Sequence, residues 1–593
     1  MTNPRPDPAP VVVVVGNGPA ALFLSYLLHG NVPFYDPATT GPHPDSHLHS
    51  LLKKYSYTPS GGPSLLDAVA DLTVLDYIRS RYVSFYSVNT NPIALLVDTL
   101  IASDEARFAS LACKQSRIKW VHLPDTAVPH IVFGASPAPG GQWAFSDNNS
   151  SVLHPDEKDQ QSLSYAEMLS LPGYSFTEFF LTANTNQIDD YVRPCRGDIS
   201  RYYAAYPHQL GLENVFQSST VVTSVDSVIN DSGERIFRVD YLHLKDPTVR
   251  LTIQTPVVVL ASGVFEKPLK ELRKNSIHQR PVSPGIMPTR LLPPQGVSRE
   301  DLEADISSRE PAVLVPQCVP SDGPSPAVLV IGSGVSAAEA VARCGQTSNV
   351  IHAFQWSNAN PSPLRRLARE SYPEYARILK LMKRAVKAQR EALAQPTTSP
   401  HDTGLDQVAI TMRQPLDDGN KPHSWYLGVA NALVQSVSPC GRVTLLLPGE
   451  MGNRTITANV SKIKICTGRS GSLEYLGPSV RRLAGLRSVN ADLGSISKTF
   501  LETHAREFSK DEVSDDDSLS ICSNDLPDCC PPSPKPGAAS SPGTSCHLRL
   551  GHGLYAIGSL TGETLVRFML GGCMWVAHDI NLNRARSKEL LAI

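Results

Sequence analysis

The sequence lacks several features that would assign it to a class at once. Its 593 residues include only 11 cysteines, an odd number with no C-x-x-C pair, which argues against both a disulfide-stapled secreted domain and a dithiol oxidoreductase. No apolar run reaches the roughly 18 residues that cross a bilayer, so no transmembrane segment is expected. With 54 Lys+Arg against 56 Asp+Glu, the net charge of −2 gives no general reason to expect nucleic acid as a partner.

The beginning of the chain also lacks the pattern of a signal peptide. Its apolar stretch is preceded only by Arg5 and Asp7, and the glycines from Gly16 interrupt it. We therefore expect a cytoplasmic protein, with the nucleus as the other compartment consistent with reduced cysteines.

Proline and glycine are abundant and gather in three stretches. The 49 Pro and 39 Gly have no strict period, and residues 270–326, 395–421 and 508–546 are predicted loops or insertions. The last of these is rich in Ser, Asp and Pro, so we expect it to be a disordered insertion and the place where protein partners would dock.

A strand, a glycine turn and a helix open the chain. Five valines end at Val15 and predict a strand buried on both faces, followed by a helix to Leu28. Gly16 to Ala21 fits G-x-G-x-x-G/A, in which Gly16 makes the tight turn, Gly18 admits a pyrophosphate and Ala21 allows close helix packing. Asp36, 20 positions after Gly16, is the expected ribose-binding acid. The alternative is an ordinary glycine turn.

The same pattern returns 316 positions later. A strand at 327–331 leads into Gly332-Ser333-Gly334 and a helix at 335–343, with Ser336 in its first turn. Two copies make coincidence a poor explanation. They predict a flavin, FAD, in the first site and a nicotinamide cofactor in the second, an arrangement that transfers hydride from NAD(P)H to FAD.

The predicted fold class is therefore α/β, with two Rossmann-like dinucleotide-binding domains. Short alternating strands near 220–228, 236–242 and 249–253 predict additional β-meander elements. We expect the first part of the FAD domain at 10–269, a loop-rich connection at 270–326, the inserted NAD(P)H domain at 327–455, and the last part of the FAD domain at 456–593.

Two further glycine clusters are candidate flavin contacts. Gly140-Gly141-Gln142-Trp143 combines a tight backbone with an aromatic ring suited to lying along an isoalloxazine, although alone it is a common turn. Near the carboxyl end, a strand leads to Gly558, and Gly571-Gly572 follows in a helical stretch. Backbone N–H groups there would face the flavin edge on which negative charge develops.

Two other clusters of residues are better explained by ordinary structural roles than by ligand binding. His43, His47 and His49 suggest a metal site, but the flanking prolines and the spacing favour a loop, so no metal is expected. The basic stretch 375–390 suits a membrane or an acidic partner, yet its apolar stripe is more typical of a helix packed on a core with a solvated charged face.

Several separated blocks resemble the oxidative stress-induced growth inhibitor family, within the flavin-containing monooxygenase superfamily. The blocks occur over almost the whole chain in the family's order: 13–24, Asn91-Pro92, 98–100, 139–143, 171–173, 199–203, 261–263, 330–338, 372–375 (YPEY), 566–568 and Gly571-Gly572.

This resemblance implies an FAD-dependent, NADPH-linked monooxygenase that restrains cell growth and division, with dioxygen and an unidentified oxygen acceptor as substrates. FAD would be bound by Gly16, Gly18, Ala21, Gly140, Gly141 and Trp143, and NADPH by Gly332, Gly334 and Ser336. Asn91 is the implied catalytic residue at the oxygen-reacting edge of the flavin. The alternative is a non-catalytic regulatory flavoprotein that acts through protein partners.

The sequence departs from the family pattern in two places. Asn91 precedes the GGQW segment, whereas relatives have the equivalent Asn after it. After the strand at 350–354, relatives carry arginines that would bind a 2′-phosphate, but this chain has Gln355-Trp356-Ser357, with Arg365 and Arg366 farther on. We therefore expect only a modest preference for NADPH over NADH.

Overall fold

The computed structural model describes most of both predicted dinucleotide domains. It covers residues 11–86, 91–101, 116–144, 161–162, 164–182, 192–264, 267–268, 312–314, 327–345, 347–357, 362–366, 372–394, 425–438, 441–447, 454–486, 548–563 and 565–592. The predicted insertion 508–546 and nearly all of the predicted connection 270–326 lie outside these residues.

The first sheet has six strands in the order β19-β20-β9-β1-β4-β5. All neighbours are parallel except β19 with β20. Counted along the chain, the five parallel strands stand in the order 3-2-1-4-5, which is the order of a dinucleotide-binding fold. The strands are β1 (Val12–Val15), β4 (His130–Phe133), β5 (Phe216–Gln217), β9 (Val257–Leu260), β19 (Arg549–Gly551) and β20 (Leu554–Ala556).

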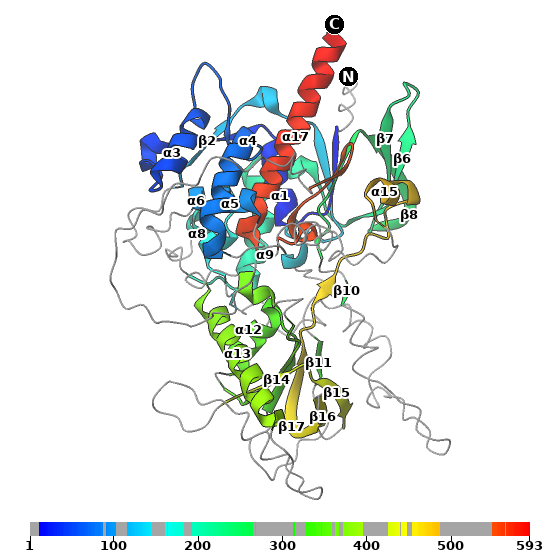
Figure 1. Cartoon of the computed structure of the whole chain (residues 1–593). Helices are drawn as coiled ribbons and strands as arrows, with labels where there is room; N and C mark the ends of the chain where they lie inside the picture. Colours follow the sequence, from blue (N-terminus) through cyan, green and yellow to red (C-terminus); the bar gives the residue numbers. More distant parts are fainter. Residues whose placement is uncertain are drawn as a thin grey trace, which may run out of the picture.

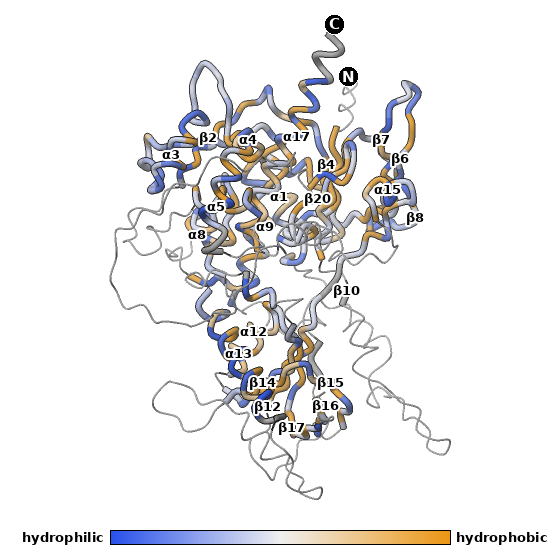
Figure 2. The backbone as a smooth tube through the Cα atoms, viewed as in Figure 1, coloured by the Kyte–Doolittle hydropathy of each residue, from blue (hydrophilic) through white to orange (hydrophobic). Residues whose placement is uncertain are grey.

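Both faces of this sheet are covered, which explains the uninterrupted valines of β1. Val12 and Val14 face a layer of helices, whereas Val13 and Val15 face a β-meander, and all four are buried. Each such side chain contributes about 1.5–3 kcal/mol on burial. Figure 2 shows the resulting apolar centre of each half. The covering helices are α1 (Pro19–Leu28), α6 (Pro92–Ile101), α9 (Arg196–Gln209) and α17 (Val566–Ala592).

The predicted meander is confirmed, with strands slightly longer than expected. Its antiparallel strands are β6 (Thr220–Ile229), β7 (Arg235–His243) and β8 (Asp246–Thr255), and α15 (Pro478–Leu483) packs against β6.

The second sheet is built from strands that lie between those of the first sheet in sequence. Its order is β14-β13-β12-β17-β16-β15, with β11 also paired to β17. Strands β12, β13, β14 and β17 are parallel and stand in the order 3-2-1-4, so this is a second dinucleotide-binding fold. The strands are β11 (Ala312–Leu314), β12 (Ala327–Ile331), β13 (Val350–Phe354), β14 (Tyr426–Ala430), β15 (Leu433–Val437), β16 (Arg442–Leu447) and β17 (Arg454–Ile465).

The predicted end of the NAD(P)H domain at 455 needs correction. Strand β17 runs to Ile465, and its residues from Val460 to Ile465 pair with β12, so the second sheet continues ten residues beyond that boundary. The fold class itself is confirmed: an α/β chain with two Rossmann-like sheets.

The two halves are joined by paired crossing segments. The chain leaves the first half through β10 (Lys267–Pro268) and returns through β18 (Arg469–Ser470), which pair antiparallel. In the second half, α12 (Val335–Cys344) and α13 (Pro373–Ala394) cover one face of the sheet (Figure 1). Among the described residues, no helix is both long and apolar enough to cross a membrane.

Candidate functional site

The first glycine loop connects β1 to α1 at the point where the strand order reverses. Gly16 has φ +118°, and a Cβ there would lie 2.2 Å from the carbonyl oxygen of Ala261 at the end of β9. Gly18, the N-cap of α1, differs, since a Cβ there would meet only the Cα of Gly141, at 3.9 Å. The fold therefore requires Gly16, whereas Gly18 leaves open space before a helix N-terminus.

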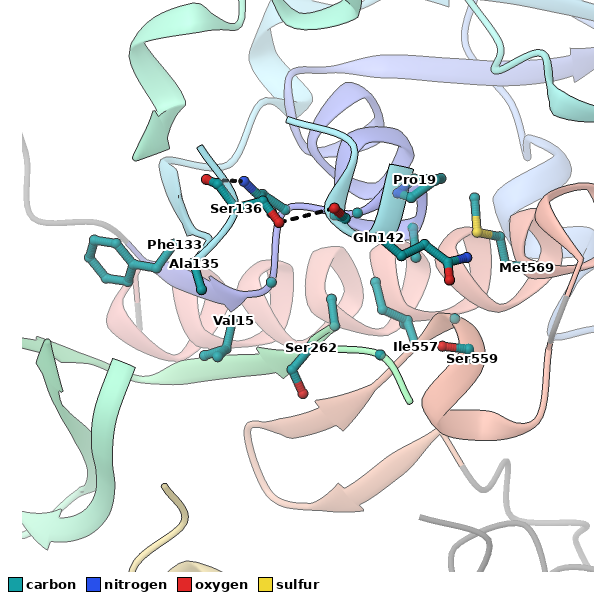
Figure 3. A pocket seen from close by; sticks show the side chains of 18 of the residues that line it. Val15, Pro19, Phe133, Ala135, Ser136, Gln142, Ser262, Ile557, Ser559 and Met569 are labelled. Carbon is teal, nitrogen blue, oxygen red and sulfur yellow. Dashed lines mark hydrogen bonds between the residues drawn. The ribbon is translucent and has the colours of Figure 1, made fainter. Parts of the chain in front are cut away.

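This open space belongs to a cavity of about 410 Å³ at the carboxyl ends of the strands (Figure 3). That volume lies within the usual range for ligand sites. Five of the predicted site residues line it: Gly16, Gly18, Gly141, Trp143 and Gly558. The wall also includes Phe133, Ala135 and Ser136, segments 220–222 and 261–263, Tyr475, and residues around the start of α17.

The loop after β4 lies directly against the first glycine loop. Gly140 has φ +122° and donates its N–H to the carbonyl of Asn17, while a Cβ on Gly141 would lie 2.8 Å from the Cα of Gly18. Trp143 follows, and its indole Nε1 is buried without a hydrogen-bond partner among the described residues. An acceptor atom on a bound ligand would satisfy this donor.

Asn17 is a site residue that the sequence reasoning missed. It is 3% exposed, and its Nδ2 donates to the carbonyls of Ser136 (3.4 Å) and Ala138 (3.1 Å), which ties the two loops together. A Cβ on Gly134 would fall 2.0 Å from its Cγ. At the end of the second parallel strand, β4, the Asn17 amide therefore occupies the space that an acidic side chain at Gly134 would need.

The predicted ribose-binding acid lies elsewhere. Asp36 follows β2 (Asn31–Tyr35), which pairs antiparallel with β3 (Ile118–His122) in a separate two-stranded sheet. Its carboxylate accepts the N–H of Thr39 and caps the short helix α2 (Pro37–Thr40). The structure does not place Asp36 among the residues that line the cavity.

Of the two predicted glycines on α17, Gly571 is a packing residue. On α17, a Cβ on Gly571 would lie 2.6 Å from the carbonyl oxygen of Ile93 in α6, and the nearest atoms to a Cβ on Gly572 belong to Leu548. Neither residue lines the cavity. The cavity wall at this end instead includes Gly558, with φ +71°, and Met569.

Asn91, the predicted catalytic residue, begins α6. Its side-chain oxygen accepts the N–H of Ile93 at 3.1 Å, and it is not among the cavity-lining residues. In this structure it acts as a helix cap. Ala21, in contrast, is fully buried in α1 within the helical layer, where its small size allows close packing.

A buried ion pair fixes α17 where it meets the cavity. The Arg567 guanidinium contacts the Asp98 carboxylate of α6, and their side chains are 10% and 2% exposed. The neighbouring Val566 and Met569 line the cavity. The pair therefore determines where the first turn of α17 lies.

The second glycine loop repeats the geometry of the first. Gly332 has φ +143°, and a Cβ there would lie 2.1 Å from the carbonyl oxygen of Cys466, after β17. Gly334, the N-cap of α12, has no described atom within 4 Å of such a Cβ, and Ser336 is exposed in the first turn. Here too, the first glycine is required by the fold and the second faces open space.

A buried histidine supports this second loop. His352 of β13 is fully buried, its Nε2 lies 2.7 Å from the Gly332 carbonyl, and its Nδ1 lies 3.0 Å from the Tyr426 hydroxyl. Burial lowers the pKa of His352 to about 4, so the ring is neutral. Because a carbonyl only accepts, Nε2 carries the proton and Nδ1 accepts from Tyr426.

Both loops fit the phosphate portion of a dinucleotide. The first turns of α1 and α12 contain no acidic residue, and a helix start leaves N–H groups without intrahelical acceptors. The first cavity adds the unpartnered Trp143 donor, which suits a resident cofactor. No group of His, Cys, Asp and Glu in the described part of the chain could hold a metal ion. The His49 ring lies 2.8 Å from the Tyr35 hydroxyl, and Nδ1 of His43 accepts the N–H of Asp45.

Comparison with known proteins shows the family. The chain is 30% identical over 399 residues to oxidative stress-induced growth inhibitor 1 of Mus musculus, covering 64% of this chain and 70% of that protein. It is 28% identical over 390 residues to growth inhibitor 2 of Homo sapiens, covering 63% and 68%. No protein-family model matches.

Solved structures resemble the chain only remotely. A flavin-containing monooxygenase from Stenotrophomonas maltophilia is 12% identical with a TM-score of 0.33, covering 78% of this chain and 92% of its own. OTEMO in complex with FAD and NADP is 12% identical with a TM-score of 0.35, covering 98% and 85%. On the sequence identity to the mouse protein, the chain belongs to the oxidative stress-induced growth inhibitor family.

Proposed function

We propose that this protein is an FAD-dependent, NADPH-linked monooxygenase. FAD would occupy the cavity at Gly16–Ala21, Gly140–Trp143 and Gly558, and NADPH would bind at the loop from Gly332 to Ser336. One observation carries the proposal: in each half, the first glycine is required by the backbone of the fold, while the second faces open space at a helix N-terminus. A fold needs no glycine at the second position unless something else approaches it.

The residues of the cavity have separable tasks in this proposal. Gly18 and the start of α1 would bind the pyrophosphate, and the Trp143 indole would donate a hydrogen bond to the cofactor. Apolar side chains at Val15, Ile557 and Met569 exclude water from the wall. When bound, FAD supplies a two-electron acceptor for NADPH and a centre that reacts with dioxygen, chemistry that side chains do not provide.

The name of the relatives supports a biological role. They are growth inhibitors, so we propose that the activity of this chain serves to restrain cell growth and division. The other candidate is a regulatory flavoprotein without turnover, which the absence of charge at Gln355–Ser357 favours, since a weak nicotinamide site would leave the flavin unreduced.

The test is to purify the protein, measure bound flavin, and add NADPH or NADH without oxygen before admitting air. Flavin that bleaches and then reoxidises supports the oxidoreductase. Bound flavin that neither nucleotide reduces supports the regulatory flavoprotein, and a colourless protein that takes up no FAD refutes both.

A further inference from the structure

Trp356 lies in a fixed position just beyond β13. Its N–H donates to Oδ1 of Asn431 at 2.8 Å, and Nδ2 of Asn431 donates back to its carbonyl at 3.1 Å. Asn431 has φ +55° and donates its own N–H to Phe354. These reciprocal bonds hold the backbone of Trp356 against the end of β14.

A short 3-10 turn, η9 (Pro363–Arg366), is anchored to the second glycine loop. The hydroxyl of Ser362 donates to the carbonyl of Ser333 at 2.8 Å and accepts the N–H of Leu364, whose side chain is buried in the core. The N–H of Arg365 donates to the carbonyl of Ser362. Arg365 therefore projects from a turn that is fixed relative to Gly332–Gly334.

The Arg365 side chain lies over the Trp356 ring. Its Cζ is 5.5 Å from the ring centroid, the residue is exposed, and no ion pair of Arg365 occurs within the described part of the chain. A guanidinium is attracted to the face of an indole and keeps its N–H donors available in that position. The end of β13 thus has a positive charge, although Gln355–Ser357 supplies none.

The position of this charge indicates a ligand. In a dinucleotide-binding fold, the residues after the second parallel strand meet the adenine ribose; an acid there binds a 2′-hydroxyl, and an arginine accommodates a 2′-phosphate. β13 is the second parallel strand of its sheet. Gln355 and Ser357 offer no carboxylate to a 2′-hydroxyl and no repulsion to a phosphate.

We propose that Arg365 and Trp356 form the site for the adenosine 2′-phosphate of NADPH, and that they make this chain selective for NADPH over NADH. This inference rests on the proposed nicotinamide site of the second half. It replaces the expectation of a modest preference, because that expectation considered only the residues adjoining the strand.

Binding of nucleotide fragments tests the site without requiring turnover. Calorimetry on the full chain should show that 2′,5′-ADP binds at least about tenfold more tightly than 5′-AMP, since a hydrogen bond to a charged group is worth that much. Arg365→Met should weaken 2′,5′-ADP by about tenfold or more and 5′-AMP by less than about twofold. Arg365→Lys keeps the charge and loses the planar guanidinium, so its affinity for 2′,5′-ADP should lie between those of wild type and Arg365→Met.

Arg390→Met is the matched control, because Arg390 is an exposed arginine of the same half on α13 and its loss changes net charge equally. It should leave both affinities unchanged. If wild type binds the two nucleotides equally, or if Arg390→Met reduces 2′,5′-ADP binding as much as Arg365→Met, the Arg365 site is refuted while the nicotinamide site stands. If folded wild type binds neither nucleotide nor NADPH, the proposed nicotinamide site is refuted and this inference with it.

Discussion

The two glycine loops have nearly the same backbone but different surroundings. Gly16 packs on the carbonyl of Ala261 and Gly332 on that of Cys466. Ala261 follows β9, which lies beside β1, and Cys466 follows β17, which lies beside β12. Beyond that, segments far apart in sequence line the cavity at the first loop, whereas at the second loop no described atom lies within 4 Å of a Cβ placed on Gly334.

The residues at the carboxyl ends of the second parallel strands, β4 and β13, also differ between the two halves. In the first half, the amide of Asn17 covers Gly134 after β4. In the second half, Trp356 and the exposed Arg365 follow β13. Enclosure suits a cofactor that stays bound, and an exposed charged site suits a nucleotide that must bind and leave in each turnover. Under the proposed function, one motif would serve both uses, and the residues around each loop would distinguish them.

The largest effect is expected from valine at either first glycine. Gly16→Val and Gly332→Val would force a branched residue into a left-handed backbone against a carbonyl about 2 Å away, and each should cost about 4 kcal/mol of unfolding free energy from backbone strain plus overpacking. Denaturant unfolding measures this loss. Near wild-type stability for either variant would mean that the loop relaxes and that the shared geometry is not required.

Breaking the buried ion pair of the first half should cost more stability than breaking a partly exposed pair in the second. Arg567→Met removes the guanidinium beside the buried Asp98 carboxylate, so a loss of about 3–5 kcal/mol is expected. Arg343→Met on α12 breaks a partly exposed pair with Glu339 and should cost less than about 1 kcal/mol. Equal losses in urea unfolding would contradict the assigned difference in burial.

Each half contains a histidine that should make stability fall in acid: the partly buried His130 in the first half and the fully buried His352 in the second. Burial lowers the pKa of His130 and of His352 to about 4, against about 6.5 in the unfolded chain. Below about pH 6.5 the unfolded chain gains a proton that the folded chain refuses, so stability is lost from there down to about pH 4, by up to about 1.4 kcal/mol per pH unit for each histidine.

The comparison between halves sharpens this prediction, since the position of His352 is occupied by Val132 in β4. His352→Val should reduce the acid sensitivity of unfolding, whereas His208→Asn, at an exposed position of α9, should not. An unchanged pH slope in the first variant would show that the histidine is protonated in the folded protein.

The smallest effect is expected from deleting 508–546, which carries neither glycine loop. Its composition cannot form a packed core, so flavin content and NAD(P)H oxidation should stay within error of wild type. Loss of flavin on deletion would show that this segment contributes to the first half.

Local patterns predicted the fold well because both halves use unbroken buried strands and glycine turns. The valines of β1 and the two glycine motifs predicted the two sheets, and the alternation of apolar and polar residues predicted the meander. The residue Asp36 shows where spacing failed: the two-stranded sheet of β2 and β3 is inserted before the true second strand, β4. Counting positions cannot reveal which later strand pairs beside β1.

Contacts across long separations were likewise beyond the sequence patterns. Gly571 looked like a cofactor glycine, but its partner is a carbonyl of α6 more than 470 residues earlier. Asn17 occupies a variable position of its motif and Arg365 lies beyond the strand, so their contacts with the loop after β4 and with Trp356 were visible only in the structure.

Reduction of the flavin in matched second-glycine variants tests the central claim, that the halves hold two separable sites. Gly18→Val should purify without FAD. Gly334→Val should keep FAD that dithionite reduces, but anaerobic stopped-flow should show NADPH reducing it far more slowly than in wild type, because the pyrophosphate can no longer approach the loop. If Gly334→Val is reduced by NADPH at the wild-type rate, or if Gly18→Val retains full FAD, the account of two sites is contradicted.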